Sequence, residues 1–180
     1  MNIRFALVGC MVGLVCSFCC EAQEQPPLPS LSALKVSAAP VLDGKLDDSC
    51  WAKAPAATNF WIWDGSGRSE NSATARLVYD DQNLYVAFYC PLKDAEALEE
   101  AKAVKAETIL GAKHIVEVFL EPYPYHARIY HFMVNAANGR HSELNGNSQW
   151  QTQWTSATFI GKDFWSAEIV IPFAALACGD

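Results

Sequence analysis

Tryptophans that stand beside amide side chains are the residues of this sequence best suited to hold a ligand. Trp150 and Trp154 lie in a polar stretch that alternates with glutamines, and Trp61 and Trp63 are two positions apart. An indole face stacks on the C–H surface of a sugar ring, and amides hydrogen-bond with neighbouring hydroxyls. The candidates for such a site are Trp61, Trp63, Trp150, Gln151, Gln153 and Trp154. The alternative is that these tryptophans pack in the core or at its rim.

An acidic residue interrupts an otherwise apolar strand pattern over residues 115–120. Strand residues alternate between two faces, so Val116 and Val118 point to one side while Glu117 points to the other, together with Phe119. The Glu117 carboxylate could accept hydrogen bonds from sugar hydroxyls or lie beside a cation. The alternative is a carboxylate that is solvated or paired with an arginine.

Catalysis by paired carboxylates is not supported. Glu117 and Glu121 fall on one strand face about 13 Å apart, whereas a glycosidase pair is separated by roughly 5–9.5 Å. Glu143 and Glu168 remain as partners without a known position. The sequence contains no Gly-x-Ser-x-Gly elbow, His-Glu-x-x-His motif or phosphate-binding Walker loop. We therefore expect that the chain is not an enzyme.

Metal and haem sites find little support in the histidine spacing. His131 and Met133 lie on one face of one strand, so a haem iron would need Met133 together with His114 or a histidine of another strand. Zinc held by His126 and His131 lacks a third ligand. Calcium could bind acids at turns, although turns favour aspartate in any case. These acids are Asp43, Asp47, Asp48, Asp80 and Asp81. We expect no cofactor, with a structural calcium ion as the open alternative.

The composition of the 180 residues excludes some partners and indicates export. Thirteen Lys and Arg against twenty Asp and Glu give a formal net charge of -7 without a basic cluster, which argues against nucleic acid and anionic membranes. Arg4 precedes an apolar run of about 16 residues, shorter than a span of roughly 20. This pattern indicates a signal peptide over residues 1–22, followed by a proline-rich linker over residues 23–35. We expect a periplasmic or extracellular protein, with cell-surface association left open and no membrane segment after cleavage.

Three cysteines remain after that cleavage, namely Cys50, Cys90 and Cys178. At most one disulfide can form within the chain. Two interpretations stay open: Cys50 and Cys90 are small buried residues, or they form a bridge that an oxidising compartment would permit.

The elements that must position these side chains are short strands separated by turns. Strands are expected over residues 36–42, 58–63, 74–79, 84–90, 115–120, 129–135, 154–160 and 164–171. Helical patterns are limited to residues 46–54 and 94–107, the second with Asp94 as a plausible N-cap. About eight or nine strands with one short helix predict an all-β fold, an immunoglobulin-like or jelly-roll β-sandwich.

Five blocks of this sequence resemble the family 9 carbohydrate-binding modules, in the same order. Residues 41–51 (VLDGKLDDSCW) are similar to the I-D-G-x-x-D-x-x-W opening, and residues 75–86 (ARLVYDDQNLYV) to the strand–turn–strand that follows it. Residues 116–122 (VEVFLEP) resemble V-E-I-F-l-D-p. Residues 132–139 (FMVNAANG) and 165–173 (WSAEIVIPF) resemble F-x-v-N-x-x-G and W-x-v-E-i-a-I-P-f. The resemblance covers about residues 36–176.

This resemblance implies a DOMON-like sandwich over residues 36–180 that binds a poly- or oligosaccharide without catalysis, often within larger exported polysaccharide-degrading proteins. Glu117 matches a ligand-binding Glu of the family. Three positions depart from the pattern: residues 107–113 lack the Trp before that strand, His114 replaces an Asp, and Met133 replaces an Arg. The family also continues into closing strands, so we expect the sandwich to be incomplete at its C-terminus. The alternatives are a structural or interaction module without sugar binding, and a DOMON-like b-haem electron-transfer domain. The oligomeric state stays open.

Overall fold

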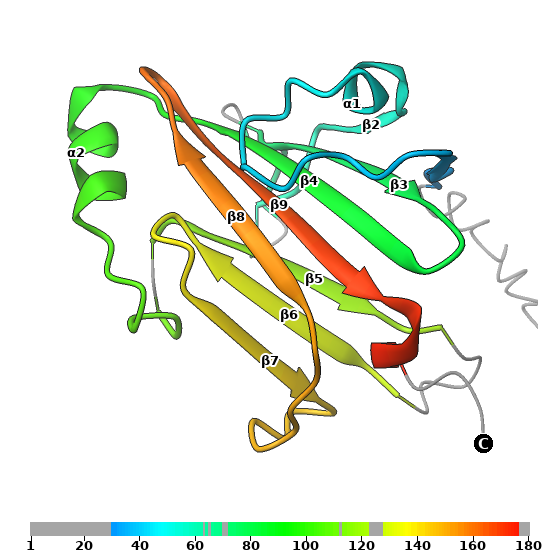
Figure 1. Ribbon diagram of the computed structural model, residues 1–180. Coiled ribbons are helices and arrows are strands. Elements are labelled where there is room, and N and C mark those ends of the chain that lie inside the picture. Colours follow the sequence, from blue (N-terminus) through cyan, green and yellow to red (C-terminus); the bar gives the residue numbers. More distant parts are fainter. Residues whose placement is uncertain are drawn as a thin grey trace, which may run out of the picture. The chain divides into compact units, whose positions relative to one another are not determined.

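Two β-sheets contain most of the elements of this computed structural model, which describes residues 30–62, 64, 66–69, 72–111, 113–122 and 128–176. The larger sheet has the strand order β1-β3-β4-β9-β8, with β2 also paired to β3, and the smaller sheet has the order β5-β6-β7. The strands are β1 (Leu34–Lys35), β2 (Ala56–Ala57), β3 (Thr74–Tyr79), β4 (Asn83–Pro91), β5 (Ile115–Leu120), β6 (Tyr130–Asn135), β7 (Arg140–Leu144), β8 (Thr155–Ile160) and β9 (Phe164–Pro172). The helices are α1 (Ser49–Lys53), α2 (Ala95–Ala103) and the 3-10 helix η1 (Phe173–Leu176). The expected all-β sandwich is confirmed (Figure 1).

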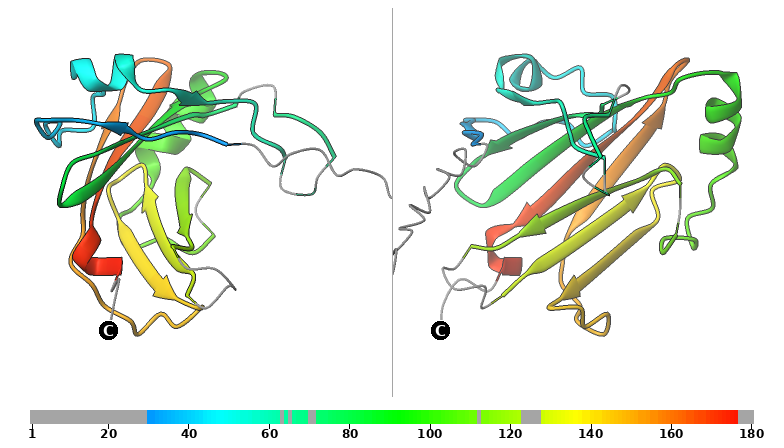
Figure 2. Two further views of the ribbon diagram at one scale, coloured as in Figure 1. Left: turned by 90° about the vertical axis from the view of Figure 1, so that its right-hand side faces the viewer. Right: turned by 180° about the vertical axis from the view of Figure 1, so that it is seen from behind.

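The main core lies between the two sheets, which form two layers when the molecule is turned by 90° (Figure 2). Alternate residues of each strand point into it, as the period of two requires. Phe132 of β6 and Ile169 of β9 are fully buried there, and Val118 of β5 joins them from the face opposite Glu117. Burying an aliphatic or aromatic side chain of this size contributes about 1.5–3 kcal/mol. The core therefore fixes which face of the small sheet points outward.

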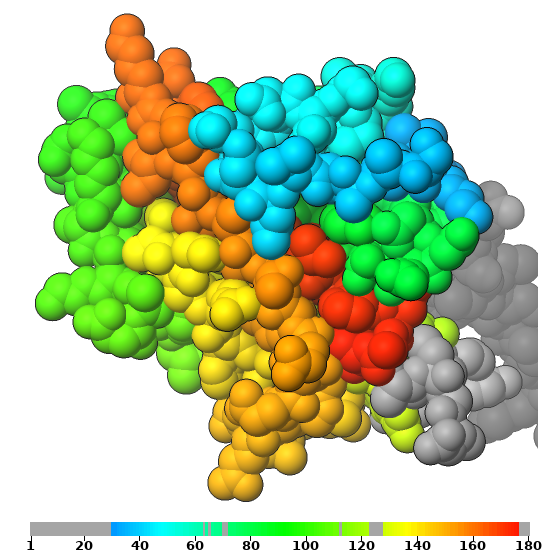
Figure 3. All heavy atoms as spheres, in the orientation of Figure 1, coloured from blue at the N-terminus to red at the C-terminus, as the bar shows by residue number. Residues whose placement is uncertain are grey.

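The outer face of the large sheet is covered by the segment that precedes β3. Trp51 of α1 packs against Tyr85 and Ala87 of β4 in a second buried cluster. In Figure 3 this segment, coloured blue to cyan, spreads over the upper part of the visible face. Gly44 has a φ of +82°, and a Cβ at this position would lie 2.5 Å from the backbone of Thr158. This loop consequently approaches β8 more closely than any other residue type permits.

Glu168 ties that covering segment to the sheet. It lies in β9, is 2% exposed, and accepts hydrogen bonds from the Trp51 Nε1 (2.8 Å) and from the backbone N–H groups of Asp43 (2.9 Å) and Gly44 (2.7 Å). Burial raises the pKa of its carboxyl, while the three donors act in the opposite direction. Glu168 is thus part of the fold and stands on the other sheet from Glu117.

Several predicted elements are confirmed, two predicted strands are wrong, and one observed strand was missed. Residues 74–79 and 115–120 form strands with the predicted bounds, and the Asp94 side chain caps α2 by accepting from the Ala97 N–H at 2.9 Å. Residues 36–42 form no strand, because their backbone is held by single contacts, such as the Val41 N–H to Asp48, rather than by a ladder. Within residues 58–62, the described part of the second predicted strand, the only strand-like pairing is an isolated bridge between Trp61 and Arg68. Strand β7 was not predicted.

At the N-terminal end, β1 falls within residues 23–35, the range expected to be a linker, and pairs in parallel with β3. The expected signal peptide lies outside the described residues. No helix among the residues that the structure describes is long and apolar enough to cross a membrane.

Cys50 and Cys90 are free thiols, so the disulfide between them is not formed. Cys50 packs against the cluster on the outer face of the large sheet, whereas Cys90 packs against the core between the sheets. The large sheet therefore separates them. Burial raises the pKa of the Cys90 thiol to about 12, which keeps it protonated and unreactive. Cys178 lies outside the described residues.

Candidate functional site: the outer face of the small sheet

The outer face of the small sheet collects polar side chains from three neighbouring strands. Glu117 of β5 lies opposite Met133 of β6, and the next pair along β5 and β6 joins Phe119 to His131. His131 in turn lies opposite Glu143 of β7. Residues directly opposite each other in an antiparallel pair point to the same face, so these side chains gather on the side away from the core.

Four side chains of this face, Glu117, His131, Glu143 and His141, form a continuous row of ion pairs and hydrogen bonds. The Glu117 Oε2 lies 2.7 Å from the His131 Nε2, and the other ring nitrogen of His131 lies 3.8 Å from the Glu143 Oε2. The remaining Glu143 oxygen lies 3.0 Å from the Nε2 of His141. His131 is thus held between two carboxylates, which fix the orientation of its ring. The set of polar groups that a hydroxylated ligand needs is therefore already positioned before any ligand binds.

An exposed aromatic ring completes this surface. The ring of Phe119 stacks on the imidazole of His131, with centroids 3.8 Å apart and an angle of 16° between the planes. Phe119 is 61% exposed although it lies in a regular strand. A large exposed apolar ring beside ordered carboxylates offers a C–H stacking surface and hydrogen-bond acceptors within one site. This is the combination that sugar recognition requires.

A groove of about 490 Å³ lies along β7, next to this surface. Its lining is mostly polar and comes from β7, from the residues after α2 and from the connection between β7 and β8. The main lining residues are Glu107, Arg140, His141, Gln151, Thr152 and Trp154. Because His141 lines the groove and also pairs with Glu143, the groove and the Glu117 surface form one continuous site.

Asn135 positions one wall of this groove. Its side-chain amide donates to the backbone carbonyls of Lys105 and Thr108, both at 2.9 Å. Its Oδ1 accepts from the backbone N–H groups of Ala137 (3.1 Å) and Gly139 (2.8 Å). One fully buried side chain therefore holds the segment that carries Glu107 against the turn between β6 and β7.

Trp150 and Trp154, which are close in the sequence, have different environments in the structure. Trp150 is half-buried and packs edge-on against Tyr130 and Phe132, so it belongs to the rim of the core. Trp154 also packs edge-on against Phe132, at 5.2 Å, but it lines the groove. The Arg140 guanidinium lies 5.5 Å from its ring centroid. The two tryptophans consequently do not share one exposed platform. Gln151 lines the groove, whereas Gln153 is exposed elsewhere.

Trp61 lies on the connection between β2 and β3, which belongs to the large sheet. It is 58% exposed, and the guanidinium of Arg68 lies 4.3 Å from its ring centroid. It does not line the groove along β7. Trp63 lies outside the described residues.

Sequence reasoning missed most partners of Glu117. The alternation in β5 already placed Phe119 beside Glu117, and this signal was available. His141 and Glu143 could not be placed because β7 was not recognised as a strand. A polar strand after the Asn138-Gly139 turn would have put both residues in register with β6.

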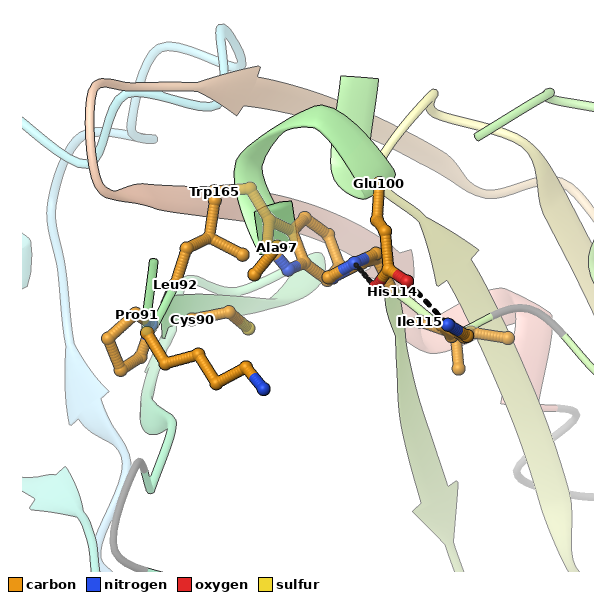
Figure 4. A pocket seen from close by; sticks show the side chains of 10 residues that line it. Cys90, Pro91, Leu92, Ala97, Glu100, His114, Ile115 and Trp165 are labelled. Carbon is orange, nitrogen blue, oxygen red and sulfur yellow. Dashed lines mark hydrogen bonds and ion pairs between the residues drawn. The ribbon is translucent and has the colours of Figure 1, made fainter. Parts of the chain in front are cut away.

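A separate hollow, of about 390 Å³, lies beside α2 and the start of β5 (Figure 4). Its polar side is formed by Glu100, which pairs with Lys113 at 2.5 Å and with His114 at 3.7 Å. The haem alternative would need His114 together with Met133. The His114 Nε2 is buried, lies 3.7 Å from the Glu100 carboxylate and has no hydrogen-bond partner among the described residues, and Met133 is only 3% exposed. These positions lend no support to an axial ligand pair.

Two of the five turn acids accept hydrogen bonds within their own backbone turns. Asp80 accepts hydrogen bonds from the backbone N–H groups of Gln82 and Asn83, and Asp43 accepts from that of Lys45. Among the residues that the structure describes, no group of three or more His, Cys, Asp or Glu side chains could hold a metal ion. His126, the second proposed zinc ligand, lies outside those residues.

Comparison with known proteins places this geometry in context. Residues 42–179 match the family model described as "Carbohydrate family 9 binding domain-like". The fold is similar to that of a family 9 carbohydrate-binding module from Caldicellulosiruptor kristjanssonii in complex with glucose, with a TM-score of 0.54, 21% identity, and coverage of 79% of this chain and 70% of that chain. The complex of such a module from the same organism with cellotriose gives a TM-score of 0.53 and 21% identity, with 78% and 67% coverage.

A shorter similarity joins the chain to an enzyme. Over 59 residues, or 32% of this chain, it is 41% identical to exoglucanase XynX from Acetivibrio thermocellus. The matched stretch represents 5% of the length of that relative.

Proposed function

The chain belongs to the carbohydrate family 9 binding domain-like family, a family of non-catalytic carbohydrate-binding modules, and we propose that its sugar site is the outer face of the small sheet together with the groove along β7. The observation that carries this proposal is the row Glu117–His131–Glu143–His141 beside the exposed ring of Phe119.

In the proposed binding mode, the C–H face of one pyranose ring lies on Phe119. The sugar hydroxyls donate to the carboxylates of Glu117 and Glu143, while the imidazole between them keeps both carboxylates in place. The next sugar units follow the row through His141 into the groove, where Gln151 and Glu107 offer further hydrogen bonds. Trp154 forms part of the groove wall from its half-buried position.

The ligand that fits best is an uncharged glucan chain. Three acidic side chains line the proposed path (Glu107, Glu117 and Glu143), and they would repel a sugar carboxylate. Uncharged hydroxyls, in contrast, are good donors to them. The bound ligands of the related family 9 structures, glucose and cellotriose, are of this uncharged class.

The setting that we propose is an exported protein linked to polysaccharide recognition or breakdown. The apolar N-terminal run with Arg4 supports export through a signal peptide, and the similarity to exoglucanase XynX supports a polysaccharide-degrading context. After export the module would be periplasmic or extracellular. Attachment at the cell surface is compatible with the same export signal. Any hydrolytic activity would reside in a separate domain.

Calorimetric titration of the purified protein with cello-oligosaccharides tests the proposed site. Phe119→Ala and Glu117→Gln should each weaken binding by about tenfold or more, because they remove the stacking ring and a charged acceptor. Matched controls are Phe60→Ala, another exposed phenylalanine, and Glu99→Gln, an exposed glutamate of α2. Neither control should change the affinity. A flat titration of the folded wild-type protein would instead favour the structural or interaction module.

A further inference from the structure

A second hollow with an aromatic wall lies on the outer face of the large sheet. It has a volume of about 400 Å³ and is formed where β3, β4 and β9 meet the covering segment. Its lining residues are Lys45, Leu46, Trp51, Ala52, Thr74, Arg76, Tyr89 and Phe164. None of them belongs to the proposed glucan site, which lies on the small sheet.

The aromatic wall consists of side chains from adjacent strands. The rings of Tyr89 and Phe164 stack with centroids 4.7 Å apart and an angle of 27° between the planes. Phe159 of β8 extends this wall, with its centroid 6.1 Å from that of Phe164. Tyr89 and Phe159 are each 36% exposed. An apolar wall of this kind, open to solvent on one side, offers a stacking surface for a sugar ring.

Arg76, a cation in this hollow, has no counter-charge among the residues that the structure describes. Arg76 stands in one cross-strand row with Ala87 and Glu168, so Glu168 is the acid of the sheet nearest to it in register. The oxygens of Glu168 are already occupied by the Trp51 indole and by two backbone N–H groups. The Arg76 Nε is buried, and no described residue forms a hydrogen bond or ion pair with the guanidinium group.

The charge of the residues that line the hollow also favours an anionic ligand. Two cationic residues, Lys45 and Arg76, line the hollow, and no acidic residue does. The protein as a whole carries a formal charge of -7, so this is a cationic spot on an acidic molecule. Lys45 is paired with Asp43 at 3.0 Å, whereas Arg76 has no ion pair within the described part of the chain. A guanidinium without an anionic partner among the described residues is available to pair with a bound anion.

We propose that this hollow binds a carboxylate-bearing pyranose, a uronic acid residue of an acidic polysaccharide. The guanidinium fork of Arg76 matches the planar carboxylate with two parallel hydrogen bonds. The C–H face of the same ring lies on Tyr89 and Phe164, and the Thr74 hydroxyl is available to the ring hydroxyls. An uncharged sugar would leave the Arg76 guanidinium without a charged acceptor. The module would thus hold two chemically different sugars on its two outer faces.

Titration of the purified protein with three matched oligosaccharides tests this assignment: an oligogalacturonate, the uncharged galactose oligomer and a sulfated galactose oligomer. We expect saturable binding of the uronate that weakens as the salt concentration rises. Arg76→Gln should lower this affinity roughly tenfold to hundredfold, and Tyr89→Ala should lower it as well. Arg68→Gln is the matched control, because that guanidinium already lies on Trp61, and it should leave uronate binding unchanged.

Arg76→Lys provides a second test that does not require the Arg76→Gln protein to fold. It keeps the charge but loses the planar fork, so uronate affinity should fall between the values for wild type and Arg76→Gln. The proposal is overturned if the uncharged oligomer binds as tightly as the uronate, or if the sulfated oligomer binds as tightly or more tightly. It is also overturned if Arg76→Gln stays folded by circular dichroism and binds the uronate with unchanged affinity. These outcomes are separate from the glucan proposal, which is read with cello-oligosaccharides and the Phe119 variant.

Discussion

Glu117 and Glu168 stand on the outer faces of the two sheets, and their surroundings differ in almost every respect. The Glu117 side chain is 41% exposed and pairs with His131, a side chain that is itself part of an open surface. Glu168 is 2% exposed, and its three donors belong to the segment that covers it. One carboxylate is free to accept a hydrogen bond from a ligand, and the other has its acceptor positions filled by its own chain.

The comparison shows that coverage of a sheet face decides the role of a polar residue on it. On the large sheet, the N-terminal segment crosses β4 and β9, and its backbone donors reach Glu168. On the small sheet, the row around Glu117 meets a groove instead of a covering segment. We therefore expect substitutions of Glu168 to act mainly on the free energy of unfolding and substitutions of Glu117 to act mainly on sugar affinity. Four predictions bear on this division between stability and binding.

The largest effect is expected from Glu168→Ala. The substitution leaves the Trp51 indole N–H and two backbone N–H groups buried without an acceptor, each at a cost of about 1–3 kcal/mol. We expect the free energy of unfolding to fall by about 3–5 kcal/mol in urea denaturation. Glu99→Ala on the exposed face of α2 is the control. A loss below about 1 kcal/mol would show that the covering segment is held by apolar contacts instead.

Asn135→Ala should reduce stability and binding together, because this residue joins the core to the groove wall. Loss of its buried hydrogen bonds should lower the free energy of unfolding by about 2–4 kcal/mol. The released segment carries Glu107, so the affinity for cello-oligosaccharides should also fall. Asn147→Ala, at an exposed turn, is the matched control. Unchanged affinity in a folded Asn135→Ala protein would remove this wall from the site.

A smaller effect is expected in the pH dependence of stability, with Glu168→Gln as the reference. Burial raises the pKa of Glu168 above its ordinary value of 4.5, so the folded state holds this proton more tightly than the unfolded state. The stability contributed by protonated Glu168 is fully present below pH 4.5 and is lost as the pH rises through the raised pKa. Wild type should thus lose stability relative to Glu168→Gln as pH increases from about 4 toward neutrality in urea unfolding. The opposite slope would mean that the three donors outweigh burial.

The smallest effect on stability is expected from Glu117→Gln. Its carboxylate is part of an exposed ion pair, so the free energy of unfolding should change by about 0.5 kcal/mol or less. The same variant should lose glucan affinity, which Glu168→Gln should largely retain when it is folded. Denaturation and titration of both variants measure this contrast. A large destabilisation by Glu117→Gln would contradict the division of roles between the two faces.

Much of the fold was predictable because apolar alternation and turn residues agree along the central strands. The pattern of β3, β4, β5 and β9 identified both the strands and their buried faces, and five sequence blocks identified the family. Strand β7 was missed because Arg-His-Ser-Glu-Leu has no apolar alternation of its own. It is an edge strand, and its pairing with β6 rather than its propensity makes it extended.

The overpredicted strands fail for the complementary reason. Residues 36–42 have the apolar pattern of a strand, but Pro40 removes one donor and the neighbouring backbone groups bond to side chains. Within residues 58–62, the described part of the second predicted strand, pairing is limited to the short turn to residues 67–69, with one bridge between Trp61 and Arg68. Local pattern indicates that a segment can be extended, whereas a ladder also needs a neighbour with free backbone groups.

The amino-acid sequence by itself determined the fold class, the family and the outward direction of Glu117, because these depend on a period of two and on short motifs. The tertiary structure alone decided which side chains surround that glutamate. Phe119, His131 and Glu143 come from three different strands, and only sheet register brings them together. It also decided that Trp150 is part of the core rim and that the Arg76 Nε is buried without a hydrogen-bond partner among the described residues. Burial and pairing depend on residues distant in the chain, and no local pattern records them.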